Sequence, residues 1–514
     1  MPKFYLTTAI DYANGEPHLG HALEKIGADC LARYRRLCGD DVHFVMGMDE
    51  HGQKVAQSAE KGGGGLPPQA WVDRIAGRFQ QTWRRLLCSN DDWIRTTEPR
   101  HRAAVAAFIG RIRARNPDDI FIGDYEGLYC VGCEEFKQES QIVDGRCVEH
   151  PTLELVKTKE RNYFFRLSRY ARRIHELIVS GEFRVEPEIR RNEVLRQIEA
   201  GLQDGSISRA RFPWGIPFPD APDHTVYVWF DALINYITAA GFPEPGFERL
   251  WPADLHVIGK GITRLHCALW PAMLLSAELP LPRMVWAHGY VQWGGAKVSK
   301  SSGGTLSVDE AIDYHGADAL RYFLLREVGF ENDGDFTWER FDARYGSELA
   351  DTFGNLVKRS LDMIHRYRGG TVPGDPQGYR TPLEDAAQSA LAAYRRAMDG
   401  FRLEEGAARW MELAARANRY IEETTPWNLA KQGHDAELDS VLANLARTVA
   451  RLAVLALPYV PTTAGSVWAL LGAPPWPPQP LDRVRLADLA TLELAGRHVQ
   501  KPPILFPKPK LAPA

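Results

Sequence analysis

The sequence predicts an α/β protein built on a parallel sheet, with a cysteine-containing insertion and a following α-helical bundle. Three observations support this class. Strand-like and helix-like segments alternate from Lys3 to about Asn116, short polar segments and cysteines fill 117–224, and nearly everything after Gly346 has helical periodicity. At 514 residues the chain exceeds what one hydrophobic core serves, so we expect several domains.

The first third carries the strand and helix pattern of a parallel sheet. Apolar runs at 4–10 and 42–48 are typical of buried strands, and apolar-periodic helices follow each run. The same rhythm returns after 225, with strand-like runs at 255–258 and 284–286. Because ligands bind at the carboxyl ends of parallel strands, we expect functional residues just after these runs.

A histidine pair lies where the first helix is expected to begin, in the run Pro17-His18-Leu19-Gly20-His21. Proline suits the first helical position because its missing N–H is unpaired there. His18 and His21, three residues apart, would share a face of the first turn beside free backbone N–H groups, and Gly20 would let a nucleotide approach closely. Taken alone, such a histidine pair is more often packed or solvated than functional.

A second run, Lys297-Val298-Ser299-Lys300-Ser301, places two lysines in a glycine-flanked segment. We expect a mobile cationic loop. Alone it would be ordinary surface, but its order and distance from the histidine pair make a chance combination improbable. No Gly-x-x-x-x-Gly-Lys-Ser/Thr run offers the other common route to nucleotide binding.

The two runs resemble the signatures of the class I aminoacyl-tRNA synthetases, His-x-Gly-His and Lys-Met-Ser-Lys-Ser. Three further runs are similar to the methionyl-tRNA synthetase family, in the same order: 9–15, Asp49-Glu50-His51-Gly52 and 227–236. The resemblance implies a Rossmann-type catalytic domain. It also implies a ligase that activates L-methionine with ATP, releases pyrophosphate and transfers the methionyl group to the 3′ end of tRNA(Met).

The resemblance also implies roles for individual residues. His18, Gly20, His21, Lys297 and Lys300 would bind ATP with Mg²⁺, and the histidines and lysines among them would be catalytic. Asp49 would hold the methionine ammonium. An apolar and aromatic pocket suits a thioether, and its lining would be Ile10, Tyr12, Trp229, Ala232, Leu233, Tyr236 and His288.

Three residues of the helical region are matched to anticodon recognition. By resemblance, Trp427 would stack on an unpaired base of the CAU anticodon, and Asn355 and Arg359 would hydrogen-bond base edges. Asn355 and Arg359 lie one helical turn apart, so they would share a face. Without the resemblance they would pass for a solvated surface.

The cysteines indicate a metal site. Seven cysteines, an odd number with only three clustered, make a poor disulfide framework. Cys130-x-x-Cys133 and Cys147-x-x-His150 provide four ligands in two pairs, as in a structural zinc site. Relatives often carry a fourth cysteine where this chain has His150.

One departure from the family pattern and two alternatives stay open. Relatives commonly show Gly-Lys-Asp where this chain has Gly259-Lys260-Gly261. A cysteinyl-type or leucyl-type synthetase would differ in the pocket around Trp229 and His288. A zinc-stabilised RNA-binding protein that has lost catalysis is the other alternative.

Composition and length set the remaining expectations. A net charge of −4 argues against indiscriminate coating of nucleic acid, and no leader or membrane span is evident, so we expect a cytoplasmic protein. We expect a monomer, because no further tRNA-binding module follows the bundle. The expected division is 1–116 and 225–325 for the catalytic domain, 117–224 for the insertion, 326–350 for a connecting stem, 351–473 for the bundle, and 474–514 for a proline-rich tail.

Overall fold

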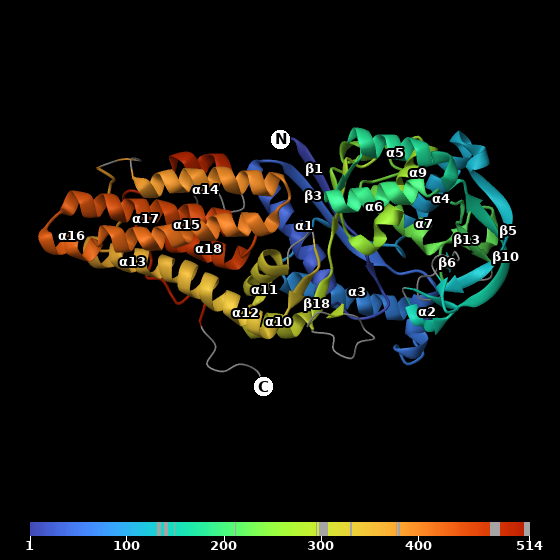
Figure 1. Ribbon diagram of the computed structural model, residues 1–514, viewed down its shortest axis with the longest axis horizontal. Helices are drawn as coiled ribbons and strands as arrows, with labels where there is room; N and C mark the ends of the chain where they lie inside the picture. The colour runs from blue at the N-terminus through green and yellow to red at the C-terminus, as the bar shows by residue number, and fades with distance from the viewer. Residues whose placement is uncertain are drawn as a thin grey trace.

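The computed structural model describes residues 1–130, 135–137, 142–148, 150–210, 212–293, 296–297, 307–328, 332–376, 378, 381–472 and 484–507. Figure 1 shows an elongated molecule with the α/β part at one end and a bundle of long helices at the other. Among the described residues, no helix combines the length and the apolar run needed to cross a membrane.

The catalytic end is built on a parallel sheet in the order β11-β17-β16-β1-β3-β2, with β4 also paired to β3. The strands are β1 (Lys3–Thr8), β2 (Asp11–Tyr12), β3 (Asp41–Asp49), β4 (Asp92–Arg95), β11 (Arg184–Glu186), β16 (Leu255–Gly259) and β17 (Met284–His288). β3 lies on one side of β1, and β16 with β17 lies on the other. The order therefore reverses between β1 and β16, which is where an open α/β sheet forms its ligand crevice.

Helices cover both faces of this sheet. They include α1 (Leu19–Cys38), α2 (Gln53–Lys61), α3 (Pro68–Arg85), α4 (Pro99–Arg115) and α9 (Trp270–Ser276). Along β1, Phe4 and Leu6 pack into one core cluster and Tyr5 packs into the other. This alternation is the period of two that a strand buried on both faces requires.

The insertion contains the expected short strands but also joins the main sheet. Its strands are β5 (Ile120–Cys130), β6 (Glu135–Lys137), β7 (Ile142–Val143), β8 (Arg146–Cys147), β9 (His150–Glu154), β10 (Val156–Phe165), β12 (Gly205–Ser206), β13 (Ser208–Ala210), β14 (Pro217–Phe218) and β15 (Ala221–Val226). Two helices that were not anticipated, α5 (Ala171–Ser180) and α6 (Glu188–Glu199), flank β11. Since β11 pairs in parallel with β17, the segment 117–224 supplies an edge strand and is not a wholly separate unit.

The chain then completes the sheet and passes through a connecting region into the bundle. Helices α7 (Val228–Leu233) and α8 (Asn235–Thr238) precede β16 and pack with the sheet. The connecting elements after β17 are β18 (Val291–Trp293), β19 (Ala296–Lys297), α10 (Val308–His315), α11 (Ala317–Phe323), β20 (Gly334–Phe336) and α12 (Trp338–Arg344). The bundle consists of α13 (Asn355–Arg368), α14 (Pro382–Asp399), α15 (Leu403–Thr424), α16 (Pro426–Gln432), α17 (Asp435–Ala456) and α18 (Pro461–Leu470). The described part of the tail, 484–507, buries Val484, Leu489 and Val499 against it.

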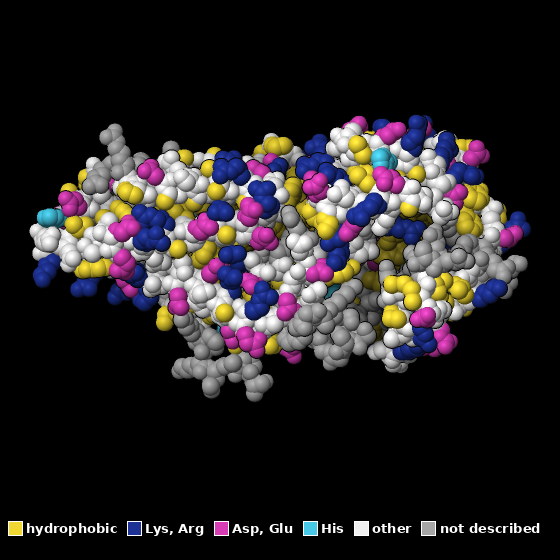
Figure 2. Space-filling model, viewed as in Figure 1, with side chains coloured by type: hydrophobic (Ala, Val, Ile, Leu, Met, Phe, Trp, Pro, Cys, Tyr) yellow, Lys and Arg dark blue, Asp and Glu magenta, His cyan; other side chains and the backbone are white. Residues whose placement is uncertain are grey.

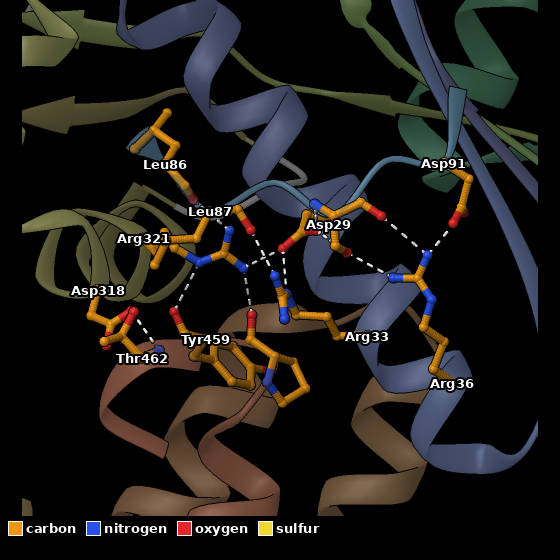
Figure 3. Close-up of polar contacts among 12 residues, drawn as sticks. Asp29, Arg33, Arg36, Leu86, Leu87, Asp91, Asp318, Arg321, Tyr459 and Thr462 are labelled. Carbon is orange, nitrogen blue, oxygen red and sulfur yellow. Dashed lines mark hydrogen bonds and ion pairs between the residues drawn. The ribbon is translucent and has the colours of Figure 1, made fainter. Parts of the chain in front are cut away.

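A buried arginine joins the two ends of the molecule. Arg321, on α11, has no exposed surface, and Figure 3 shows its guanidinium between α1 and the turn from α17 to α18. It donates to the Asp29 carboxylate on α1 at 2.7 Å and to the Leu86 carbonyl at 3.0 Å. It also donates to the carbonyls of Pro458 at 2.8 Å and Tyr459 at 3.2 Å. One side chain therefore bonds to the catalytic domain and the bundle together.

We predict that Arg321→Met lowers the free energy of unfolding by about 3–5 kcal/mol, because it removes the charge facing buried Asp29 and three carbonyl partners. Chemical denaturation followed by circular dichroism measures this loss. Arg172→Met is the matched control, since the Arg172 side chain is 92% exposed. An equal and small effect of both substitutions would contradict the structural role of Arg321.

Candidate active site

The histidine pair caps the first helix in a way that differs in detail from the sequence expectation. The helix begins at Leu19 and not at Pro17, and His18 is the N-cap residue. The Gly20 N–H donates to His18 Nδ1 at 3.1 Å, and the His18 N–H donates to His21 Nδ1 at 3.3 Å. The sequence led us to expect free N–H groups in this turn. Instead, the imidazoles accept hydrogen bonds from these two N–H groups. With each Nδ1 acting as an acceptor, Nε2 is the donor nitrogen of both neutral rings.

Ring stacking fixes this arrangement. The His18 and His21 rings stack with centroids 3.7 Å apart. A Cβ atom at Gly20 would lie 3.0 Å from His18 Cε1. The His18 ring itself therefore leaves little room for a side chain at position 20. The pair is thus a preorganised set of donors at the carboxyl side of β1 and the positive end of α1.

A residue that follows the lysine run lies beside the first histidine of the pair. Lys297 is the last residue of β19, and Ser307 forms an isolated antiparallel bridge with His18. Lys300 and the Lys297 side chain lie outside the described residues. The bridge nevertheless brings Ser307, six residues after the lysine run, to the N-terminus of α1, although nearly 300 residues separate the two in sequence.

The residues expected to bind methionine gather at the carboxyl ends of the central strands. Tyr12 on β2 is the register partner of Asp49, the last residue of β3. Ile10 lies between β1 and β2, and its side chain faces Gly47 of β3. Trp229, Ala232 and Leu233 come from α7, Tyr236 comes from α8, and His288 ends β17.

Tyr236 is the most constrained member of this group. Its hydroxyl lies 2.6 Å from His266 Nε2, and because His266 Nδ1 donates to the Ile262 carbonyl, the tyrosine must be the donor. Burial raises the pKa of Tyr236 well above its usual value, and the nearby carboxylates of Glu24 and Asp49 add to the shift. Tyr236 therefore stays protonated, with its hydroxyl already used inside the protein.

A buried charge network on α1 was not anticipated from sequence. Lys25 has no exposed surface; its ammonium lies 3.0 Å from Asp11 and 2.7 Å from Glu24, and it donates to the Ala9 carbonyl at 2.7 Å. Glu24 lies 3.2 Å from His288 Nε2. Burial raises the pKa of Asp11 to about 6 although Lys25 opposes the shift. The sequence feature that could have revealed this network is the pair of adjacent charges, Glu24 and Lys25, within the apolar pattern of the helix.

A second unanticipated network fixes α7. The Asp231 carboxylate accepts from His51 Nδ1 at 2.6 Å and from His101 Nε2 at 2.7 Å, and all three side chains are buried. Despite burial, the two histidines hold the pKa of Asp231 below its usual value. His51 and Asp231 lie in the sequence runs already singled out, whereas nothing local marks His101.

The expected zinc ligands are only partly described. Cys130 ends β5, Cys147 lies on β8, and both are buried and free of disulfides. The backbone of His150 is the register partner of Cys147. Cys133 and the His150 side chain lie outside the described residues, among which no group of three possible metal ligands occurs.

The expected anticodon residues lie in the bundle. Asn355 is the exposed first residue of α13, and Arg359, one turn later, pairs with Glu422 on α15 at 2.5 Å. Trp427, on α16, is 41% exposed. Figure 1 places α16 at the end of the molecule farthest from the sheet.

A parallel sheet whose order reverses between β1 and β16, a histidine-capped helix that follows β1, and a bridge from His18 to Ser307 agree with the architecture of a class I aminoacyl-tRNA synthetase. Residues 4–154 and 143–361 match the family model for class I tRNA synthetases (M), and 373–510 match the anticodon binding domain of methionyl tRNA ligase. The chain belongs to the methionyl-tRNA ligase family.

Individual relatives agree with this assignment. The chain is 41% identical over 473 residues to the methionine–tRNA ligase of Thermotoga maritima, covering 91% of this chain and 75% of that one. It is 39% identical over 529 residues to the Bacillus subtilis enzyme, covering 98% and 78%. The crystal structure of Mycobacterium tuberculosis methionyl-tRNA synthetase bound by methionyl-adenylate is similar, with a TM-score of 0.92, 38% identity and coverage of 98% of this chain and 100% of that one.

The protein therefore activates L-methionine with ATP to methionyl-adenylate, releasing pyrophosphate, and transfers the methionyl group to tRNA(Met).

We predict that Lys25→Met lowers the free energy of unfolding at pH 7 by about 3–5 kcal/mol, because Asp11 and Glu24 lose their buried cation. Without Lys25 the folded-state pKa of Asp11, which burial already raises, would rise further, and Glu24 would lose a cation that lowers its pKa. Both carboxyls would therefore bind protons more readily in the folded state than they do in the parent. Such groups favour the folded state at low pH, so the loss should be smaller at pH 5 than at pH 7. Chemical denaturation at pH 5 and pH 7 measures the loss of unfolding free energy, and Lys358→Met is the exposed control. A loss of the same size at both pH values would contradict the prediction.

Proposed function

We propose that His18, Gly20, His21, Lys297 and Lys300 form the ATP site, with Mg²⁺ bound to the nucleotide phosphates. The observation that carries this proposal is the bridge between His18 and Ser307, a residue six positions after the end of the lysine run. The paired histidines offer Nε2 donors at a helix N-terminus. The donors and the positive end of the helix dipole both favour an anion there.

The proposed chemistry needs positioning and charge stabilisation more than proton transfer. The methionine carboxylate, already ionised, attacks the α-phosphorus of ATP, a P–O bond forms, and the bond to pyrophosphate breaks. Negative charge moves onto the leaving pyrophosphate during this step. Donors and lysines placed around the phosphates stabilise that charge.

For methionine, we propose that Asp49 binds the ammonium group and that Ile10, Tyr12 and the α7 and α8 residues enclose the side chain. Asp49 is 4% exposed and adjacent to Tyr12. The remaining lining would be Trp229, Ala232, Leu233, Tyr236 and His288. The Tyr236 hydroxyl donates a hydrogen bond to His266. The tyrosine would therefore present mainly its ring to the methionine thioether.

We predict that His21→Ala or Lys300→Ala lowers methionine-dependent ATP–pyrophosphate exchange about 100-fold or more, equivalent to roughly 3 kcal/mol of transition-state stabilisation. The circular dichroism spectrum should be unchanged. Exchange close to that of the parent in both variants would refute the assignment, and no exchange in the parent would favour a protein that has lost catalysis.

We propose one structural zinc ion per chain, held by Cys130, Cys133, Cys147 and His150. Cys130 and Cys147 are both buried, and Cys147 pairs in register with His150, so three of the four positions come from adjoining strands. Thiolate and imidazole are the ligands that zinc prefers. Four protein ligands would leave no open position, which suits a structural role.

We predict that protein purified without chelator contains one zinc per chain and that Cys147→Ser lowers both zinc content and thermal stability. Cys38→Ser, outside the proposed set, is the control and should keep its zinc. Elemental analysis gives the metal content and differential scanning calorimetry gives the stability. A metal-free parent would overturn the proposal.

We propose that Asn355, Arg359 and Trp427 read the CAU anticodon. The exposure of Trp427 supports stacking on an unpaired base and argues against a role in the core. Arg359 and Glu422 hold a polar surface between α13 and α15. Figure 2 shows Lys and Arg side chains along the lower edge of the free end of the bundle, which would favour RNA there.

We predict that Trp427→Ala weakens tRNA charging by about 1–3 kcal/mol at sub-saturating tRNA while leaving pyrophosphate exchange almost unchanged. The two assays separate anticodon binding from activation because α16 lies far from the sheet. Charging at the parent rate would contradict anticodon recognition at this site, and an equal loss in both assays would mark Trp427 as a structural residue.

A further inference from the structure

Gly261 borders the crevice at which the sheet order reverses. It follows β16 by two residues, and β16 lies next to β1 at the reversal point. Helix α1 borders the same crevice, because Glu24, one turn after His21, lies 3.2 Å from His288, and His288 is the register partner of Gly259. Position 261 therefore lies at the same end of the sheet as the proposed ATP site.

The room for such a side chain is taken by Tyr290. A Cβ atom at Gly261 would lie 2.1 Å from the Tyr290 hydroxyl oxygen. Real Cβ atoms essentially never come within 3.0 Å of a heavy atom outside their own and the adjoining residues. The next nearest atom, ring Cζ of Tyr290, would be at 3.4 Å. Gly261 does not have a positive φ. The tyrosine hydroxyl alone therefore excludes a side chain at this position.

Surrounding contacts hold Tyr290 in place. Its N–H donates to Asp333 Oδ1 at 2.8 Å, and its carbonyl accepts from the Gly334 N–H at 3.0 Å. The Lys260 ammonium donates to Asp333 Oδ2 at 2.8 Å and lies 4.7 Å from the centroid of the Tyr290 ring. The ion pair and the cation–π contact thus fix both the backbone and the ring.

We propose that the Tyr290 hydroxyl replaces the side chain usual at position 261 and hydrogen-bonds an oxygen of the bound ATP. This inference rests on the proposed ATP site. A phenol is neutral at physiological pH and can both donate and accept, so it can bind a ribose hydroxyl or a phosphate oxygen. A carboxylate at the same place would only accept and would add negative charge beside the triphosphate.

The first test is Tyr290→Phe, which removes the hydroxyl and keeps the ring. In methionine-dependent pyrophosphate exchange, the KM for ATP should rise about 3- to 10-fold, as for one lost hydrogen bond. The KM for methionine and the thermal midpoint should stay unchanged. Gly261→Ala should also raise the KM for ATP, because its Cβ must displace the hydroxyl.

The decisive test is the double variant Gly261→Ala/Tyr290→Phe. Once the hydroxyl is gone, the nearest atom to the new Cβ is Cζ at 3.4 Å, an ordinary contact. Adding Gly261→Ala to Tyr290→Phe should therefore not raise the KM for ATP further. The effects of the two substitutions on this KM should be strongly non-additive. Gly77→Ala, where a Cβ meets nothing within 4 Å, and Tyr367→Phe, on α13, are the matched controls.

Three results would overturn the inference. They are a KM for ATP of Tyr290→Phe within twofold of the parent, additive effects in the double variant, or a rise in both KM values together with a lower thermal midpoint. His21→Ala in the same assay separates this inference from the ATP site. If His21→Ala abolishes exchange and Tyr290→Phe has no effect, only the inference about Tyr290 fails; if neither changes exchange, the site itself is wrong.

Discussion

The ion pair between Asp29 and Arg321 is the contact on which the relation between the two ends of the molecule depends. Both side chains are fully buried, so each charge is tolerated only because the other is present and because carbonyls and Ser89 complete their hydrogen bonds. The geometry of a planar guanidinium leaves little freedom to the groups it bonds. The turn after α17 is therefore held in one position relative to α1 (Figure 3).

Helix α1 connects this contact to the chemistry. Its first turn carries the stacked histidines, its second carries Glu24 and Lys25, and its third reaches Asp29. The polar groups of the second and third turns are buried and specifically paired, and the histidines of the first are half-buried and stacked on each other. Buried ion pairs of this kind contribute more to a unique arrangement than to net stability, because desolvation offsets much of their attraction. They fix the rotation and position of the helix that carries the residues proposed to bind ATP.

The pocket walls are positioned by the same means from the opposite side of the sheet. Asp231 receives two histidine donors, one after β3 and one from α4, so α7 is tied to the segment that contains Asp49. Tyr236 is tied to His266, and its ring lies 4.3 Å from that of His256. The residues expected to enclose an apolar amino acid thus stand on a polar, hydrogen-bonded framework, which would preserve the shape of the proposed pocket before the ligand binds.

The sequence by itself determined the α/β class, the positions of four main strands along the chain, the helical bundle and the family, because periodicity and the signature runs are local properties. It placed the site residues at strand ends, but it misplaced the start of α1 and took the first-turn N–H groups as free. Only the tertiary structure decided that imidazoles cap that turn, that Lys25 and Asp231 are buried among opposite charges, and that β11 joins the main sheet. It also showed that Tyr290 occupies the space beside Gly261. These are contacts between segments far apart in sequence, and their partners are chosen by packing and burial, which no local pattern records.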